Sequence, residues 1–197
     1  MVSLNVQSNV KQWSRRMAAV ERKQVPFATA VALTKTAKDV ERNTLKLLDR
    51  RLDRPTPFTK RGLFVKAANK HRLVAKVGFK PIQAAYLDKP ERGGTRKPKG
   101  RAIIVPASQR LNRYGNLPKG SVQRLLARDD TFSGEVRGVP GIWQRNKKGG
   151  LKLLIAYVER ATYKPQLRFQ AGAMKTARAR FPIQWRRAFE SAVRTAR

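Results

Sequence analysis

The sequence predicts an α+β fold in which a mostly antiparallel sheet packs against long N-terminal helices and a C-terminal helix, with one extended basic loop. Apolar residues recur at helical spacing near both ends of the 197-residue chain. Short runs of β-branched and aromatic residues cluster between these ends, as expected for sheet strands. The length fits one structural domain over residues 1–197.

Two helices are expected in the N-terminal part, residues 7–52. The first covers about residues 7–23, because Val10, Trp13, Met17 and Val20 recur at helical spacing. Pro26 suits the first turn of the second helix, and the prolines at 55 and 57 end it.

The second helix has one small and apolar face and one charged face. Its small residues indicate close packing against a sheet or a neighbouring helix. The apolar face contains Ala30, Leu33, Ala37, Val40, Thr44 and Leu47, and the charged face contains Lys35, Lys38, Arg42, Lys46, Asp49 and Arg50.

Strands are expected within residues 62–87 and 101–163. Residues 62–67 and 73–79 alternate in polarity and predict a hairpin that turns at Asn69–His71. The run at 82–87 fits a strand or a helix. Residues 102–105 predict a short buried strand.

The following segment predicts a short helix over 121–128, with Ser121 as its N-cap, and then strands over 131–137, 141–145 and 151–158. The last of these is apolar enough to lie centrally in the sheet. The C-terminal helix is expected over 169–196, kinked or split at Pro182.

Residues 88–101 form the expected basic loop, or arm. The stretch DKPERGGTRKPKGR combines glycine, proline and positive charge, which favours irregular structure. We expect it to order only on binding a partner.

Net charge is the most unusual property of the chain. Lys and Arg number 45 against 12 Asp and Glu, a formal charge of +33, while 41% hydrophobic residues suffice for a packed core. Such a charge requires an anionic partner or a neutralising assembly: nucleic acid, an acidic protein surface or an anionic membrane. No apolar run is long enough to span a bilayer, and residues 1–10 lack signal-peptide features, so synthesis in a cytoplasm is expected.

Candidate catalytic and metal-binding residues are few. The chain has no cysteine and a single histidine, His71, so a thiolate site or a His-based metal site cannot form within one subunit. Asp129 and Asp130 follow a helix, as turn residues do, and Gly93–Gly94 lacks the spacing of a phosphate-binding loop. We therefore predict a protein that is not an enzyme and has no cofactor or metal.

The candidate binding residues are basic or aromatic. The candidate contacts to an anionic partner or DNA are Arg92, Arg96, Lys97, Lys99, Arg101, Arg113, Lys147 and Lys148, and the candidate interface residues are Trp13, Trp143, Arg186 and Arg187. The aromatic set Phe132, Trp143, Tyr157 and Tyr163 lies within apolar strand patterns. This favours core or interface packing over stacking on unpaired bases.

Several blocks of the sequence are similar to a known family. The run MAAVERKQVPFATAVALTKTA (17–37) resembles the opening of the phage minor tail protein Z family and related tail-completion proteins. The resemblance continues through KPIQAAYL (80–87), ERGGTR (91–96), IIVP (103–106), RYGNLPKG (113–120), GVPGIWQR (138–145), LKLLIAYV (151–158) and YKP (163–165). These are packing and turn motifs.

The resemblance implies a structural α+β protein of a tailed-phage virion. It would be assembled in the host cytoplasm as a homo-oligomeric ring, expected to be a hexamer, in the neck or tail where head and tail join. Its neighbours would be tube, connector or tape-measure proteins, it would contact viral DNA in passing, and no membrane would be involved.

The charge of such a ring exceeds what DNA can neutralise. Six copies carry roughly +200. Duplex DNA presents one negative charge per ~1.7 Å, so a lumen about 50 Å long meets only about 30 phosphates. Most basic residues are therefore expected to face acidic proteins.

Three other functions fit part of the sequence evidence. A ribosomal or other RNA/DNA-binding protein fits the size and charge, although no helix-turn-helix, zinc-finger or RNA-recognition pattern is present. A nuclease or integrase fragment requires clustered acids or histidines that the sequence lacks. A membrane-surface role requires an amphipathic basic helix, and no convincing one is found.

Overall fold

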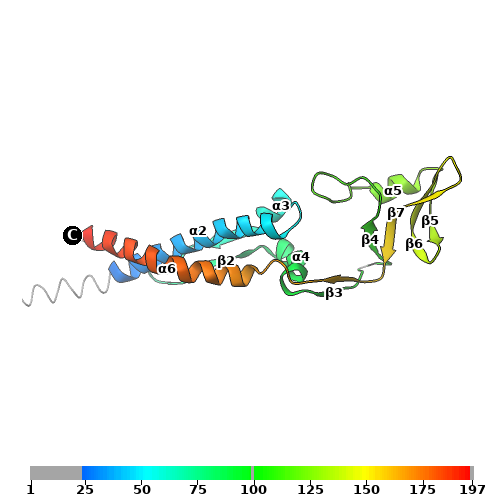
Figure 1. Cartoon of the computed structure of the whole chain (residues 1–197). Coiled ribbons are helices and arrows are strands. Elements are labelled where there is room, and N and C mark those ends of the chain that lie inside the picture. The colour runs from blue at the N-terminus through cyan, green and yellow to red at the C-terminus, as the bar shows by residue number, and fades with distance from the viewer. Residues whose placement is uncertain (1–23, 99, 196–197) are drawn as a thin grey trace, which may run out of the picture. The chain divides into compact units, whose positions relative to one another are not determined.

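The computed structural model describes residues 24–98 and 100–195 (Figure 1). The contacts group into two compact units, a division that the sequence analysis did not include. Of the described residues, the first unit comprises 24–47, 61–80 and 169–195, and the second comprises 48–60 and 81–168. The single domain expected from the sequence stays a prediction.

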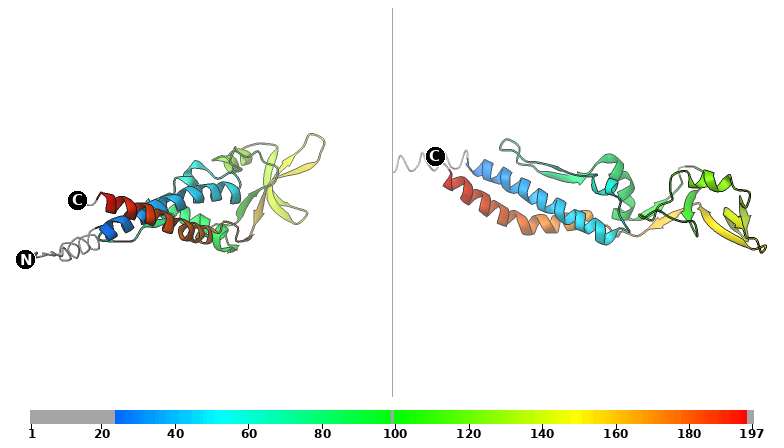
Figure 2. Two further views of the ribbon diagram at one scale, coloured as in Figure 1. Left: turned by 60° about the vertical axis from the view of Figure 1, so that its left-hand side comes forward. Right: turned by 90° about the horizontal axis from the view of Figure 1, so that it is seen from above.

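The first unit is built on two antiparallel helices, α2 (Val25–Arg51, with its last turn in the second unit) and α6 (Phe169–Arg194) (Figure 2). Their contact is made by the buried alanines Ala28, Ala32, Ala188 and Ala192. Small side chains allow two helix backbones to approach closely. At the edge of this contact the rings of Trp185 and Phe189 stack, with centroids 5.0 Å apart.

Helix α2 confirms the second helix expected from the sequence. All six residues of its predicted apolar face are buried or half-buried, and all six of its predicted charged face are exposed. The expected first helix, residues 7–23, lies outside the described residues. Helix α6 continues through the exposed Pro182, so the expected split at this proline is wrong. At an exposed position, water can satisfy the carbonyl that proline leaves unpaired.

A hairpin completes the first unit, as predicted. Strands β1 (Leu63–Lys66) and β2 (Lys76–Phe79) pair antiparallel, from Leu63 opposite Phe79 to Lys66 opposite Lys76. The backbone N–H of Ala68 donates to Thr34 Oγ1 of α2 at 3.1 Å, and the Phe79 and Phe169 rings meet edge to face at 5.2 Å. These contacts attach the hairpin to both helices.

The second unit contains an antiparallel sheet, and together with the helices it confirms the α+β class. The expected packing of this sheet against the long terminal helices stays a prediction. The four strands of the sheet are ordered β4 (Ile103–Pro106), β7 (Leu151–Val158), β6 (Val139–Arg145) and β5 (Thr131–Val136). Strand β7 is central, as predicted. Helix α5 (Ser121–Leu126) supplies Leu125 to a core shared with Ile142, Leu154 and Ile155. The unit also includes the short helix α3 (Pro57–Lys60).

The stretch from 81 to 101 differs from the prediction. Residues 81–92 form helix α4 (Pro81–Arg92), which resolves the ambiguous run at 82–87 as a helix. Residues 94–96 form strand β3 (Gly94–Arg96), which pairs with β8 (Ala161–Tyr163). The basic loop expected over 88–101 is therefore regular structure in its first half. Proline in the first turn favours a helix, because its missing N–H would be unpaired there anyway.

Two local predictions are also wrong. Strand β4 lies at the edge of the sheet and exposes Ile104 and Val105, so it is not a buried strand. The N-cap of α5 is Gly120, in the left-handed conformation at φ 75°. The Ser121 hydroxyl instead donates to the carbonyl oxygen of Pro118 at 2.6 Å.

Strand β6 requires glycine at position 141. A Cβ on Gly141 would overlap the backbone oxygen of Ile155 and lie 2.8 Å from Leu153 Cδ1. We expect Gly141→Ala to lower the free energy of unfolding of the second unit by about 1–3 kcal/mol, because the two strands must separate. Denaturant unfolding followed by circular dichroism measures this.

The matched control is Gly134→Ala in the neighbouring strand, where a Cβ would meet only the Phe132 ring at 3.5 Å, an ordinary contact distance. Equal losses of stability in the two variants would contradict the close packing at Gly141.

Candidate anion-binding surface

The second unit contains a cleft of about 520 Å³ between α5 and the segment that precedes it. Its lining combines apolar residues with basic and polar ones, and includes four arginines and no acidic residue. The arginines are Arg110, Arg113, Arg124 and Arg128. Planar guanidinium groups bind phosphate or carboxylate oxygens in pairs, so this lining suits an anion.

One asparagine shapes the wall of the cleft. Asn112 Oδ1 accepts hydrogen bonds from the backbone N–H groups of Tyr114 at 2.9 Å and Asn116 at 3.1 Å. The Asn112 N–H donates to the Asn116 oxygen at 2.9 Å, which closes the loop. The Arg113 guanidinium then lies over the Tyr114 ring, 4.7 Å from its centroid.

Two of the four arginines are held within the unit. Arg124 Nη2 donates to the Lys119 oxygen at 3.1 Å. Arg128 donates two hydrogen bonds to Asp130, at 2.8 and 2.6 Å, which raise the pKa of Arg128 and, with one from Gln144, lower the pKa of Asp130. Asp130 offsets the charge of Arg128, so Arg110, Arg113 and Arg124 give the cleft its positive charge.

Several of the predicted basic contacts lie on the surface of the second unit. Arg92 is in the last turn of α4 and pairs with Asp88 at 3.2 Å, while Arg96 and Lys97 are neighbours in one pocket of this unit. Arg101 is exposed, and Lys147 and Lys148 are exposed in the turn between β6 and β7. Lys99 lies outside the described residues.

The predicted interface residues are spread over both units. Trp143 is half-buried in β6, where its Nε1 donates to the Val139 oxygen at 3.3 Å. Arg186 and Arg187 are exposed on α6. Trp13 lies outside the described residues.

Sequence reasoning placed Arg113 among the contacts but missed the cleft around it. Arg124 and Arg128 are spaced four residues apart after the RYGNLPKG turn, a spacing that could have signalled a shared basic face. Arg110 joins them only through the fold of the preceding segment.

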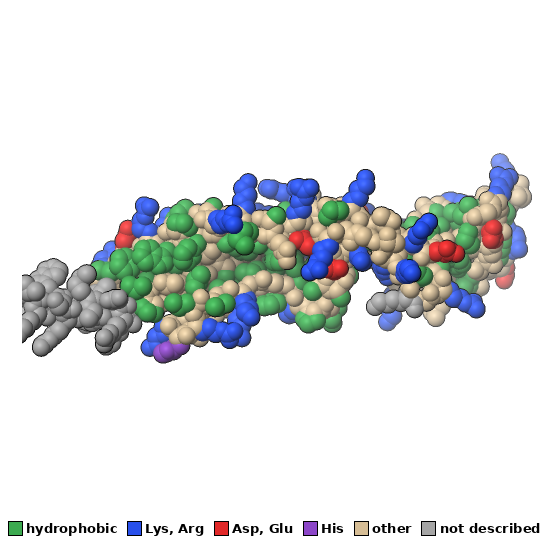
Figure 3. Space-filling view, turned by 90° about the horizontal axis from the view of Figure 1, so that it is seen from below, with side chains coloured by type: hydrophobic (Ala, Val, Ile, Leu, Met, Phe, Trp, Pro, Cys, Tyr) green, Lys and Arg blue, Asp and Glu red, His purple; other side chains and the backbone are tan. Residues whose placement is uncertain are grey.

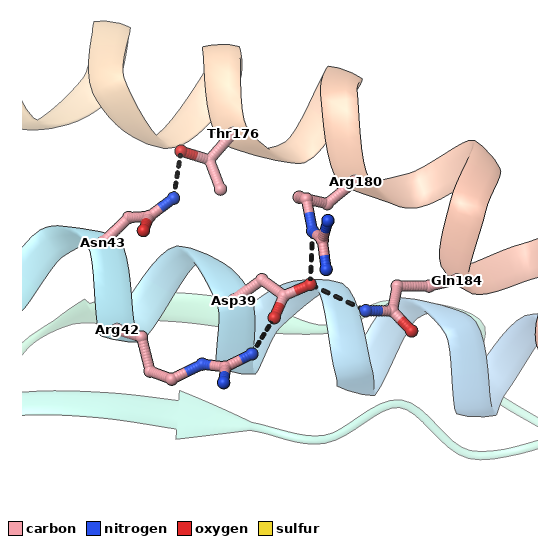
Figure 4. A network of polar contacts seen from close by, with 6 residues as sticks. All are labelled: Asp39, Arg42, Asn43, Thr176, Arg180 and Gln184. Atoms are coloured by element: carbon pink, nitrogen blue, oxygen red, sulfur yellow. Dashed lines mark hydrogen bonds and ion pairs between the residues drawn. The ribbon is translucent and has the colours of Figure 1, made fainter.

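The first unit contains a buried acidic residue that the sequence analysis also missed (Figure 4). Asp39 on α2 is 5% exposed, and its Oδ2 accepts hydrogen bonds from Arg180 Nε at 3.0 Å and Gln184 Nε2 at 2.7 Å, both on α6. Arg42 donates to the other oxygen. A lone acid next to Val40 of the predicted apolar face was the available signal.

The Asp39 network ties α2 to α6. Burial raises the pKa of Asp39, but hydrogen bonds from Gln184, Arg180 and Arg42 outweigh it and hold the pKa below its ordinary value. One helical turn further along, Asn43 Nδ2 donates to Thr176 Oγ1 at 3.3 Å. Polar contacts therefore extend the α2–α6 contact beyond its buried alanines.

The described part of the chain was predicted to hold no metal site, and its single histidine was predicted to lie in a turn. No three His, Cys, Asp or Glu side chains among these residues lie close enough to share a metal ion. His71 is exposed in its turn, where its backbone N–H donates to Asn69 Oδ1 at 3.0 Å. Among the same residues, no helix has the length and apolarity that crossing a membrane requires.

The chain matches no protein-family model, and it has no significant match among curated proteins or solved structures. Function is therefore inferred from the charge, the exposed surfaces and the residue blocks of the chain itself.

The Asp39 network makes the stability of the first unit depend on pH in the acidic range. Because the pKa of Asp39 is lower in the folded state, its contribution is present above the unfolded value near 3.9 and is lost as the pH falls through the folded value. We expect Asp39→Asn to lower the free energy of unfolding of the first unit at pH 7 by about 1–3 kcal/mol. Below about pH 4, the stability of the variant should fall less steeply with decreasing pH than that of the unsubstituted chain.

Denaturant unfolding at pH 7 and at several acidic pH values tests this expectation. The control is Asp49→Asn in the same helix, which removes a half-exposed ion pair with Lys60 of α3 in the second unit. It should leave the first unit unchanged and cost the second unit under about 1 kcal/mol. An acid dependence unchanged by Asp39→Asn would contradict the assigned role.

Proposed function

We propose that this chain is a non-enzymatic structural subunit of the neck or tail of a tailed bacteriophage. In this role it forms a ring, a hexamer by the family resemblance, that helps to join the tail to the head and lets DNA pass. The observation that carries the proposal is the large amount of exposed apolar surface on a chain of +33.

The exposed apolar side chains are too numerous for a self-sufficient monomer. Fifteen large hydrophobic residues are exposed among the described residues, whereas nine apolar residues larger than alanine are buried. Ile82 is 68% exposed and Met174 is 55% exposed. Extensive exposed apolar surface marks sites of protein association, so burial in an assembly accounts for it.

Positive charge accompanies apolar side chains on the surface. On the face drawn in Figure 3, hydrophobic side chains lie among many Lys and Arg, with few Asp and Glu. Apolar contact combined with charge complementarity is how protein interfaces achieve both affinity and correct pairing. The proposed neighbours are therefore acidic surfaces of tube, connector or tape-measure proteins, with DNA as a passing contact.

The phage assignment itself is supported by the residue blocks that resemble minor tail protein Z and tail-completion proteins. Within it, the basic stretch 88–101 is proposed to reach a neighbouring protein or the lumen. Charge reversal at Arg96, Lys97 and Lys99 is expected to block tail joining or DNA passage, and particles of normal yield and infectivity would contradict this.

The oligomeric state of the purified chain tests the proposal. Light scattering and negative-stain microscopy at several salt concentrations should show a closed ring, alone or on addition of a tail protein, without nucleic acid. A chain that stays monomeric with every tail protein tried, and binds RNA tightly, would contradict it.

A second candidate function, RNA or DNA binding, is favoured by the arginine cleft. Under this function, Arg110→Ala/Arg113→Ala should weaken binding of a 20-nucleotide RNA and reduce the slope of log affinity against log salt by about 1.4, because two phosphate contacts are lost. Fluorescence anisotropy measures both quantities. The charge-matched control is Lys46→Ala/Arg50→Ala, at exposed positions of α2.

If log affinity falls with log salt equally steeply in the two double variants, the cleft does not take part in nucleic-acid binding.

A further inference from the structure

Helix α4 leaves a regular stripe of residues uncovered. Its exposed or half-buried residues Ile82, Ala85, Tyr86, Lys89 and Pro90 are spaced three and four apart, so they share one face. Gln83 and Leu87 are the buried residues of the helix. A helix normally covers such a stripe with protein, yet Ile82 is 68% exposed and Tyr86 is 42% exposed.

The stripe forms one wall of a pocket of about 470 Å³ within the second unit. The other wall is formed by Arg96 and Lys97, at the end of β3, and by Tyr163 of β8. Gly94 lies opposite Tyr163 in the β3–β8 ladder. Apolar side chains therefore line the interior, three cations belong to the lining, and no acidic residue does.

The pocket is held in shape by contacts at its base. The Pro90 carbonyl oxygen accepts hydrogen bonds from the N–H groups of Gln166 and Leu167, both at 2.9 Å. Gly93, at φ 77°, turns the chain from α4 into β3 so tightly that a Cβ there would lie 2.9 Å from Pro165 Cδ. Tyr86 donates its hydroxyl proton to Thr59 Oγ1 at 2.9 Å, which fixes its ring. A preformed pocket loses little entropy on binding.

We propose that this pocket docks an acidic segment of a neighbouring protein through one large aromatic or aliphatic side chain. The apolar anchor fills the space between α4 and Tyr163, while carboxylates flanking it pair with Lys89, Arg96 and Lys97. This inference rests on the proposed role as an assembly subunit and specifies the chemistry of one partner.

A nucleic acid suits this lining less well than a peptide does. The rings of Tyr86 and Tyr163 could stack on a base, but Ile82, Ala85 and Pro90 between them offer aliphatic surface and no hydrogen bonds for base edges, and the Tyr86 hydroxyl is already bonded to Thr59. An anchor in a pocket with a charged rim is the usual arrangement of a protein hot spot.

The test uses a fluorescein-labelled peptide with a Trp–Leu pair between glutamates, titrated with the full chain and followed by anisotropy. Ile82→Glu and Arg96→Glu/Lys97→Glu should each weaken binding at least about tenfold. The controls Met174→Glu, an exposed apolar residue on α6, and Lys46→Glu/Arg50→Glu, an equal change of charge on α2, should each change affinity by less than about twofold. Circular dichroism checks that each variant is folded.

Three results would overturn the inference. One is equal weakening in the pocket and control variants, which indicates net charge alone. Another is undiminished binding of a peptide in which alanines replace the Trp–Leu pair. The third is a 12-nucleotide oligo-dT that binds more tightly than the peptide and is weakened by Ile82→Glu.

Light scattering on the same samples separates this inference from the proposed function. A ring that forms while the peptide fails to bind supports the assembly role and contradicts docking at the pocket. Peptide binding by a chain that forms no ring supports the docking pocket and contradicts the proposed ring assembly.

Discussion

A shortage of acidic side chains constrains the whole chain. Twelve Asp and Glu stand against 45 Lys and Arg, so most cations cannot be paired within the molecule. Ion pairs among the described residues include Asp39–Arg42, Asp39–Arg180, Asp49–Lys60, Asp53–Arg54, Asp88–Arg92 and Asp130–Arg128. The uncompensated charge must be met by something outside the chain.

The apolar side chains show the same incompleteness. The seam between α2 and α6 is largely alanine, which permits close approach but buries little area per residue. The cluster of buried residues under the sheet of the second unit has four members, Leu125, Ile142, Leu154 and Ile155. Meanwhile the stripe on α4 and the edge strand β4 expose large apolar residues. A chain with modest cores and open apolar faces reaches its lowest free energy in contact with partners.

Sequence patterns predicted the elements whose signal is long and local. Helix α2 carries more than six turns of helical spacing, which predicted its buried face. Strand β7 is an apolar run of eight residues, which predicted its central place in the sheet. Residues 82–87 were ambiguous because six residues fit both periods, and Pro81 at the first turn was the deciding feature. The pairing of β3 with β8 joins segments more than sixty residues apart, which periodicity does not report.

The candidate sites were predictable only in part, for the same reason. Arg113, Arg96 and Lys97 could be singled out by charge and local composition, but the cleft and the pocket need neighbours that the tertiary fold supplies. Asp39 looks unremarkable among charged residues until α6 brings Arg180 and Gln184 against it. Contacts between distant segments therefore decide which charges are structural and which are available to partners.

Quantitative mass spectrometry of purified tailed particles, produced by cells that carry the gene, tests the central claim most directly. The account predicts that the chain co-sediments with the particles at a fixed low copy number, about six per particle if the ring is a hexamer. A chain that is missing from the particles and sediments instead with ribosomes or nucleic acid would contradict it.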